Sequence, residues 1–219
     1  MAIVVHKHAA TQGPGRPKDL EKRAAILDAA KRLFVEQGYA GTSMDAVAAV
    51  AGVSKLTVYS HFGDKDNLFR EAVRLCCQEI LPEELYQPSP GTPVEDALMA
   101  IARRHAELMT SVEAIGLWRA VSSDCQDGSP RFGPLLWQEG PQRTRLLLEL
   151  LLAHHVEQGT LDIDDVSQAT GQFMALLKGD LHFRRMLGCV DEDSTEFPRE
   201  VVDTAEAAVT MFLRAYRPR

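Results

Sequence analysis

The sequence has no stretch long enough to span a membrane and no cysteine pattern typical of a metal or redox centre. Its apolar runs fall well short of the roughly 18 residues that cross a bilayer, and the opening MAIVV is too short for the core of a signal peptide. None of the four cysteines belongs to a Cys-x-x-Cys pair. We therefore expect a cytoplasmic protein whose cysteines are ordinary thiols.

Catalytic motifs are also absent. The 219 residues contain no nucleophile motif, no pair of carboxylates at a catalytic spacing and no phosphate-binding loop. The histidines are scattered, and the adjacent His154 and His155 would point about 100° apart on a helix, which suits a single metal ion poorly. An all-helical enzyme or metal protein is thus the weaker alternative, and we expect no cofactor. Metal analysis of the purified protein would test the metal version.

Charge is distributed unevenly along a chain of ordinary globular composition, with 45% hydrophobic and 25% charged residues. The net charge of −7 by itself argues against a nucleic-acid partner. Residues 1–75, however, hold eleven basic and eight acidic residues and so carry +3, whereas residues 76–219 carry −10. A mildly basic N-terminal part therefore precedes an acidic remainder, and nucleic-acid binding stays open for the basic part.

Residues 1–18 are predicted to form a flexible arm. Residues 1–15 lack helical periodicity, and Pro17 favours an extended chain on either side of it. Arg16 and Lys18 flank this proline and give the arm its positive charge. Such an arm could follow the phosphate backbone of DNA or enter the minor groove.

Helical periodicity begins at Asp19. An apolar stripe with spacings of three and four defines the first helix, for which Gly38 is the expected end. A second helix follows, with Thr42 or Ser43 as its N-cap and Gly52 as its end. The stripe of the first helix consists of Ile26, Leu27, Ala30, Leu33 and Phe34.

The third helix is short and lies only one turn beyond the second. Ser54 can cap it and Gly63 ends it, after which Asp64 can cap a fourth helix. Two short helices joined by a tight turn form the helix-turn-helix pattern. Val58 and Phe62, four residues apart, would anchor the third helix to the first two, which leaves its polar side chains directed outward.

The polar side chains of the third helix have the chemistry of contacts to the DNA major groove. Lys55 can donate to guanine O6 or N7, and Thr57 can reach a base edge, a phosphate or a thymine methyl group. Leu56 could meet a thymine methyl group or simply lie exposed, and Ser54 is better explained as a cap. Tyr59 serves equally well as half-buried structure. The side chains suited to phosphate oxygens are Ser43, Tyr59, Ser60, His61 and Lys65.

The run TSMDAVAAVAGVSKLTVYSHFGDKDNLF resembles the DNA-binding segment of TetR-family transcriptional regulators. The shared features are the Thr-Ser cap, the alanine-rich helix, Gly-Val-Ser, Thr-x-Tyr-x-His-Phe and Lys-Asp-x-Leu-Phe, in the same order and spacing. The match covers roughly residues 20–72. The residues that fall where family members contact operator DNA are Lys55, Thr57, Tyr59, Ser60, His61 and Lys65. We add as candidates Arg16, Lys18, Thr42, Ser43, Ser54 and Leu56.

The remaining sequence predicts an all-α fold with a second domain. A proline-rich stretch ends at residue 93, and beyond it helical periodicity continues without strand alternation. The apolar run at 146–152 predicts a buried central helix. We expect helices at 93–110, 112–126, 131–158, 163–188 and 197–216. The expected domains are a flexible arm at 1–18, a helix-turn-helix domain at 19–64, a connecting helix at 65–80 and an effector-binding and dimerisation domain at 81–219.

The resemblance implies that this last domain binds a small effector and forms a homodimer through its final two long helices. The text LLKGD at 176–180 is loosely similar to the subgroup related to AcrR and AefR regulators. Pockets between helices are mostly apolar with a few polar groups, although the same residue types also suit core or dimer packing. The candidate effector contacts are Met99, His105, Met109, Trp118, Arg119, Trp137, Phe173 and Met174, with Asp124 as a further polar candidate.

These patterns together predict a dimeric regulator, most simply a repressor that leaves a palindromic operator when an effector binds. A single short recognition helix makes few contacts, and a dimer doubles them across two half-sites about 34–36 Å apart. The fourth helix joins the two domains and is the natural lever between them. A DNA-binding protein that has lost its response to ligand stays an open alternative.

Overall fold

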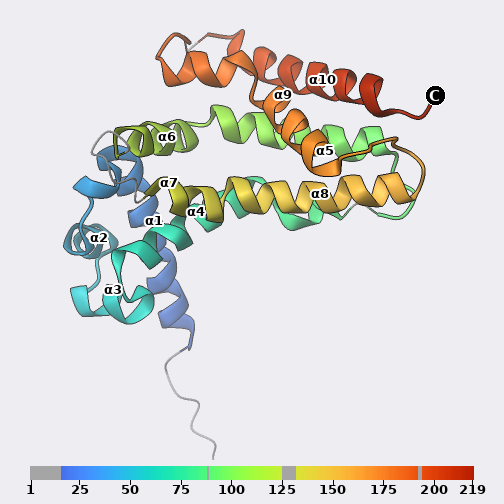
Figure 1. The fold of residues 1–219 in the computed structure, drawn as a ribbon. Helices are drawn as coiled ribbons and strands as arrows, with labels where there is room; N and C mark the ends of the chain where they lie inside the picture. Colours follow the sequence, from blue (N-terminus) through green and yellow to red (C-terminus); the bar gives the residue numbers. More distant parts are fainter. Residues whose placement is uncertain (1–15, 88, 125–131, 192–193) are drawn as a thin grey trace, which may run out of the picture.

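The computed structural model describes residues 16–87, 89–124, 132–191 and 194–219, and every regular element in those ranges is a helix. The all-α prediction is confirmed. Figure 1 shows a small group of N-terminal helices at one end and a longer layered bundle extending away from it. None of the described helices is long and apolar enough to cross a membrane.

Three helices form the head, which we define as α1 (Arg16–Gly41), α2 (Met44–Ala51) and α3 (Lys55–Phe62). The caps of the two short helices follow the sequence, because Ser43 Oγ accepts from the Ala46 backbone N–H and Ser54 Oγ accepts from the Thr57 N–H. Each accepted bond satisfies a backbone donor that the helix itself leaves unpaired.

The first helix differs from its prediction at both ends. It begins at Arg16, so residues 16–18 of the predicted arm lie in its first turn. Pro17 is tolerated there because the N–H groups of a first helical turn have no partner within the helix. The rest of the predicted arm, residues 1–15, lies outside the described residues. At the other end the chain departs from helical geometry at Gly38 (φ 69°, ψ 178°) and makes one further turn to Gly41.

The connecting helix α4 (Lys65–Ile80) is capped by Asp64, whose carboxylate accepts from the Asn67 N–H. Leu68 and Phe69 are buried against the head. Two ion pairs join α1 to α4: Arg23 with Glu71 at 2.8 Å and Lys31 with Glu79 at 3.0 Å. The head and α4 therefore pack as one unit.

The body comprises the elements after α4. They are a short 3-10 helix η1 (Glu83–Tyr86), α5 (Val94–Thr110), α6 (Val112–Asp124), α7 (Phe132–Glu139), α8 (Pro141–Glu157), α9 (Val166–Met186) and α10 (Phe197–Tyr216). The core of the body lies among α5, α8, α9 and α10, where Ile101, Leu152 and Phe173 are completely buried. In Figure 1 the chain of α9 crosses between α10 and the pair α5 and α8.

The single helix predicted at 131–158 is two helices, α7 and α8. Gly140 (φ −113°, ψ −88°) breaks the helix, and Pro141, which has no N–H, begins the next one. The break also brings α4 close, since a Cβ atom at Gly140 would lie 3.3 Å from Cys77 Sγ. The apolar period continues across the break, which is why the sequence suggested one helix. The helix predicted at 163–188 is α9, with a second departure from helical geometry at Gly179 (φ 55°).

The leucine-rich run at 146–152 is only partly buried, which corrects the prediction of a buried central helix. Leu148, Leu151 and Leu152 face the core, whereas Leu146 and Leu150 are exposed, the latter by 70%. Residues four apart share one face of a helix, so α8 has a buried face and an exposed leucine pair.

Head and body share hydrophobic contacts. The cluster that contains the core of the head also includes Val121 of α6 and Phe132, Leu135 and Leu136 of α7. The ring of Phe132 stacks on Tyr39 with centroids 3.5 Å apart. The head is therefore supported by α4, α6 and α7 together.

Candidate DNA-binding surface and effector cavity

Helix α3 is held by two buried side chains and presents its other faces outward. Val58 is completely buried and Phe62 nearly so, whereas Lys55, Tyr59 and Ser60 are exposed. Burying two positions four residues apart orients a short helix without covering its polar residues. The third helix is thus anchored as its sequence predicts.

The hydroxyl groups of α3 are engaged with their own helix. Ser54 Oγ and Thr57 Oγ1 lie 2.8 Å apart, and Ser60 Oγ donates to the Thr57 carbonyl oxygen at 2.8 Å. These local bonds are of the kind that compete with other partners of serine and threonine. Leu56, in contrast, is 78% exposed and contributes a large apolar side chain to the same surface.

Lys55 forms an ion pair with Asp45 of α2, with Nζ 2.9 Å from Oδ1. The hydrogen bond to Asp45 raises the pKa of Lys55, so the ammonium is charged at any physiological pH. Its Nζ also lies 5.9 Å from the centre of the Tyr59 ring. Exposed pairs of this kind are weak, and Lys55 can exchange Asp45 for a base or a phosphate.

His61 and Lys65 contact α1 and its final turn. His61 Nε2 lies 3.1 Å from Asp19 Oδ1, and the imidazole is mostly shielded from solvent. Lys65 Nζ lies 4.1 Å from the centre of the Tyr39 ring, and the Tyr39 hydroxyl bonds to Asp66. Both residues are therefore placed between the elements of the head, at the edge of the α3 surface.

Thr42 differs from the other DNA-binding candidates, because only 2% of it is exposed. Its hydroxyl bonds to the carbonyl oxygens of Leu33 at 3.0 Å and Gly38 at 2.8 Å. It thus stabilises the irregular end of α1 and has no surface left for DNA. Ser43 beside it is exposed and caps α2. The side chains of Arg16 and Lys18 lie outside the described part of the structure.

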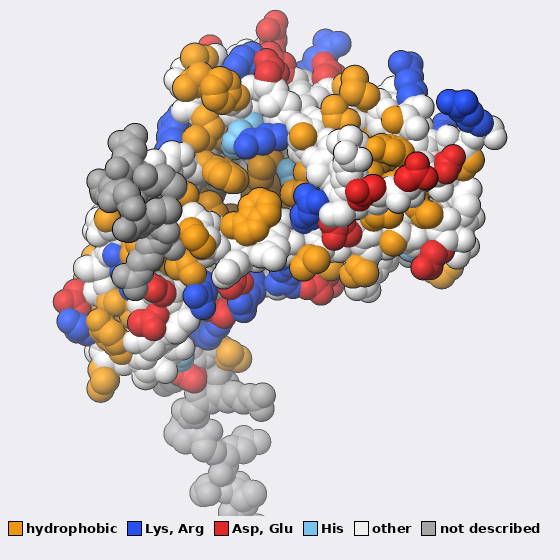
Figure 2. All heavy atoms as spheres, viewed as in Figure 1, with side chains coloured by type: hydrophobic (Ala, Val, Ile, Leu, Met, Phe, Trp, Pro, Cys, Tyr) orange, Lys and Arg blue, Asp and Glu red, His pale blue; other side chains and the backbone are white. Residues whose placement is uncertain are grey.

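A cavity of about 270 Å³ lies between α4 and the helices α5 to α9 of the body. On the face drawn in Figure 2 the surface is hollowed, and hydrophobic, basic and histidine side chains border the hollow. Five predicted effector contacts line the cavity: His105, Met109, Trp118, Trp137 and Met174. The chain has two tryptophans, and both are among them.

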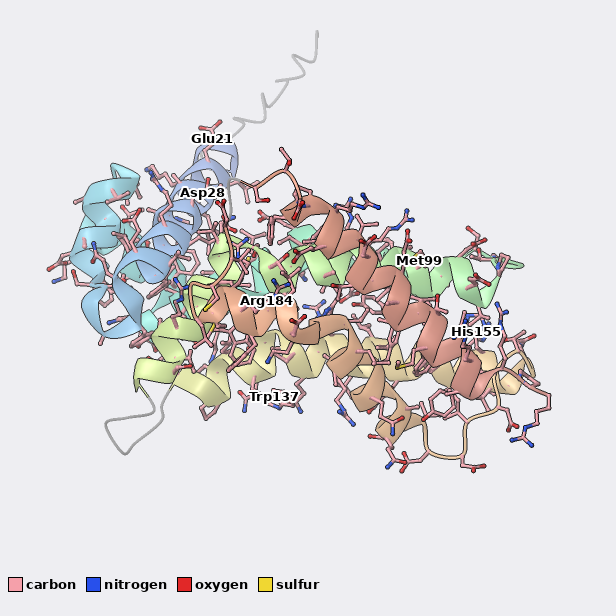
Figure 3. All side chains as sticks on the ribbon, turned by 90° about the horizontal axis from the view of Figure 1, so that it is seen from above. Glu21, Asp28, Met99, Trp137, His155 and Arg184 are labelled. Atoms are coloured by element: carbon pink, nitrogen blue, oxygen red, sulfur yellow. The ribbon has the colours of Figure 1, made fainter. Side chains whose placement is uncertain are left out.

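Three other predicted contacts lie elsewhere. Met99 packs against the core of the body, and Figure 3 shows it well apart from Trp137. Phe173 is completely buried, with its ring 4.8 Å from that of Phe212. Arg119 donates to the carbonyl oxygen of Arg185 at 2.7 Å, at the end of α9. The side chain of Asp124 lies outside the described residues.

Sequence reasoning missed several residues of the cavity. Cys76 and Cys77 reach it from α4, and Lys178 reaches it from α9. Lys178 follows Met174 by four residues and so shares its helix face, a spacing that could have identified it. Burial raises the pKa of Cys77 to about 12; this thiol is therefore neutral and contributes apolar lining.

Two polar side chains of the cavity lining, His105 and Lys178, form a cluster with His182, which packs against Trp118. His105 is only 4% exposed, and its Nδ1 has no hydrogen-bond partner among the described residues. Burial, and then the charges of His182 and Lys178, lower the pKa of His105 to about 4. His182 Nδ1 is held 2.7 Å from the Met109 carbonyl oxygen, and Lys178 Nζ lies 4.9 Å from the centre of the Trp118 ring. At neutral pH the cluster therefore contains a neutral imidazole beside an ammonium group.

A larger hollow of about 490 Å³ lies beside the contact between α1 and α6. Gly116 lies at its edge, and a Cβ atom there would come within 2.7 Å of Val35 Cγ1. Helix α6 thus touches α1 on one side and lines the smaller cavity through Leu117 and Trp118 on another. No group of three potential metal ligands occurs in the described residues.

Comparison with known proteins separates the chain into two matched parts. Residues 26–72 match the family model described as bacterial regulatory proteins of the tetR family. Residues 96–218 match the model described as the C-terminal domain of AefR-like transcriptional repressors. The AcrR regulator of Shigella flexneri is 45% identical over 76 residues, which are 34% of this chain and 35% of AcrR. The chain thus aligns with little more than a third of that relative.

Solved structures match over almost the whole chain. A TetR-family regulator from Mesorhizobium loti is 26% identical, with a TM-score of 0.76, over 93% of this chain and all of that one. The flavonoid-responsive regulator FrrA is 31% identical, with a TM-score of 0.68, over 90% of this chain and 98% of its own. Both parts of the molecule, in one arrangement, are therefore similar to known transcriptional regulators.

Proposed function

Since this chain belongs to the TetR family of bacterial transcriptional regulators, we propose that it is a homodimeric repressor that binds a palindromic operator and leaves it when a small molecule binds. The observation on which the proposal rests is α3, which is anchored by Val58 and Phe62 and directs Lys55, Leu56 and Tyr59 outward. A helix presented in this way fits the major groove. Its place of action would be the cytoplasm, where the DNA is.

The dimer would form through α9 and α10. Large apolar side chains are exposed on both: Phe183 on α9 by 64%, Leu187 directly after α9 by a similar fraction, and Met211 and Val202 on α10. Large exposed hydrophobic side chains favour a protein–protein contact. A second copy would cover them and place two α3 helices for two half-sites.

The cavity is the proposed effector site, and two helices connect it to the head. Helix α4 contributes Val73, Cys76 and Cys77 to the lining and begins directly after α3. Helix α6 lines the cavity and contacts α1 at Gly116. An effector that prefers one position of these helices shifts the population toward it, and operator affinity falls in proportion to that preference.

The size of the cavity favours a small organic effector. FrrA, which is similar to this chain over nearly its full length, is described as flavonoid-responsive. We extend to this chain only the size class that this name suggests, a compact molecule of a few rings. The cavity of about 270 Å³ is near the lower end of ligand pockets.

Selection of random duplex DNA by the purified protein tests the operator proposal. The expected result is an enriched palindromic sequence that two protomers bind, with an affinity that falls steeply as the salt concentration is raised. That DNA then serves for release assays with candidate effectors. If the recovered DNA has no common sequence, specific operator binding is contradicted. If no compound releases the protein from its DNA, the protein is a regulator without ligand response.

A further inference from the structure

We infer that the effector is an aromatic compound bearing one acidic group, and that Lys178 and His105 form the subsite for that group. This inference rests on the proposed function, because it concerns the chemistry of the same cavity. It goes beyond the size class by assigning a charge and an orientation to the ligand.

The charge balance of the cavity is the first reason. Among the described residues, its lining contains no aspartate or glutamate and two cations, Arg145 and Lys178. Arg145 is already neutralised, since its Nε lies 3.1 Å from Glu149 and a terminal nitrogen donates to the Ser167 carbonyl oxygen at 2.7 Å. Lys178 forms no ion pair within the described part of the chain and rests on the face of Trp118. An ammonium group beside an apolar cavity is stabilised by an anion.

The unpartnered imidazole is the second reason. His105 is almost completely buried, and its Nδ1 lacks a hydrogen-bond partner among the described residues. Buried polar atoms in native proteins are nearly always paired, so an atom left open beside a cavity suits a ligand. Both Lys178 and His182 influence His105 electrostatically. A carboxylate or phenolate oxygen near Lys178 could therefore also accept a hydrogen bond from His105.

The apolar lining is the third reason, and it favours a flat ring system. Trp118 and Trp137 contribute indole rings to the lining, while Met109 and Met174 contribute flexible thioethers. Indoles and thioethers both make favourable contacts with aromatic rings. The cavity is too small for a long acyl thioester but large enough for two or three rings.

Matched acids and amides test the assignment directly. The probes are 2-naphthoate, biphenyl-4-carboxylate and 4-hydroxycinnamate, each compared by titration calorimetry with its neutral primary amide at pH 7.5. At least one acid is expected to bind about ten- to a hundredfold more tightly than its amide, as one charge-assisted contact allows. Equal binding of acid and amide throughout, or binding by none of the three acids, would overturn the inference.

Variants locate the subsite. Lys178→Met keeps the length of the side chain and is expected to remove the preference for the acid while leaving amide binding within about twofold. His105→Gln retains an N–H donor and should keep most of the preference, whereas His105→Leu should lose about tenfold on the acid. Arg104→Met, at an exposed position of the same helix as His105, is the matched control and should change nothing. Circular dichroism verifies that each variant is folded.

Release of selected operator DNA separates this inference from the proposed function. An acid that binds through Lys178 without weakening operator binding would contradict the effector role but support the subsite. Amides that release the operator as well as the acids would contradict the subsite but support the effector role.

Discussion

The two polar regions of this molecule differ in how their groups are satisfied. On the DNA-binding surface almost every polar side chain already has a partner: Lys55 has Asp45, His61 has Asp19, and Ser60 bonds to the carbonyl oxygen of Thr57. In the described part of the cavity the imidazole of His105 has an open nitrogen and Lys178 has no carboxylate partner. When the head binds DNA, its side chains must give up hydrogen bonds and ion pairs within the protein for those to DNA, which favours selectivity. When the cavity binds a ligand, its polar groups gain partners that they lacked, which favours affinity.

The strongest test of this comparison removes the anchor of α3. Phe62→Ala should cost about 3–5 kcal/mol of stability, because Phe62 is buried between helices of the head. Operator binding should be lost, while an aromatic acid should still bind the cavity. Denaturant unfolding, a DNA gel-shift assay and calorimetry measure these effects. Leu56→Ala is the exposed control and should leave stability unchanged. If Phe62→Ala loses ligand binding in the cavity and Leu56→Ala does not, the DNA-binding surface and the cavity are not independent.

The pH dependence of stability isolates the cavity. The pKa of His105 is lowered to about 4 in the folded state, so between that value and its ordinary value near 6.5 the unfolded chain binds more protons. Stability therefore rises with pH through this window and is lost as the pH falls, by up to about 3 kcal/mol from this residue. His105→Gln should flatten the curve measured by urea unfolding from pH 7 to pH 4. An unchanged slope would mean that folding does not lower the pKa of His105.

Substitutions at two lysines divide the DNA surface into reading and anchoring contacts. Lys55→Ala should weaken the preferred operator about five- to a hundredfold and relax base preference. Lys65→Ala should weaken all sequences alike and reduce the dependence on salt. Both are measured by titration of matched and mismatched duplexes at two salt concentrations. Identical profiles for the two variants would refute the division.

The smallest expected effect concerns Asp45, the partner of Lys55. Asp45→Asn should increase operator affinity less than about fivefold, because an exposed ion pair is weak and its loss frees Lys55 for DNA. The increase should be greater on random DNA than on the operator, so specificity falls. A decrease in affinity would indicate that Asp45 positions Lys55 for its contact.

Local chemistry explains which parts of the structure could be predicted. Ser43, Ser54 and Asp64 cap their helices as expected, since capping involves only atoms within three residues. Pro17 was misjudged because a first helical turn accepts it. The break at Gly140 was missed because the apolar period continues through it.

The cavity depends on packing and is less visible in the sequence. Met99 and Met174 are the same residue type, yet only Met174 lines the cavity. Thr42 and Ser43 are adjacent candidates, yet one is buried and the other exposed. Lys178 and His105 line the same cavity only because α5 and α9 pack together. Such differences follow from helix rotation and crossing, which periodicity alone does not determine.

The placement of both tryptophans in the cavity has a practical consequence. The tryptophan emission of this protein originates entirely beside the proposed effector site. Trp118 is in contact with a lysine ammonium group and Trp137 is half exposed, so their emission reflects local charge and hydration. Ligand binding in the cavity can therefore be followed on the unlabelled protein by its tryptophan emission. DNA binding at the head changes that emission only if it moves the helices of the body.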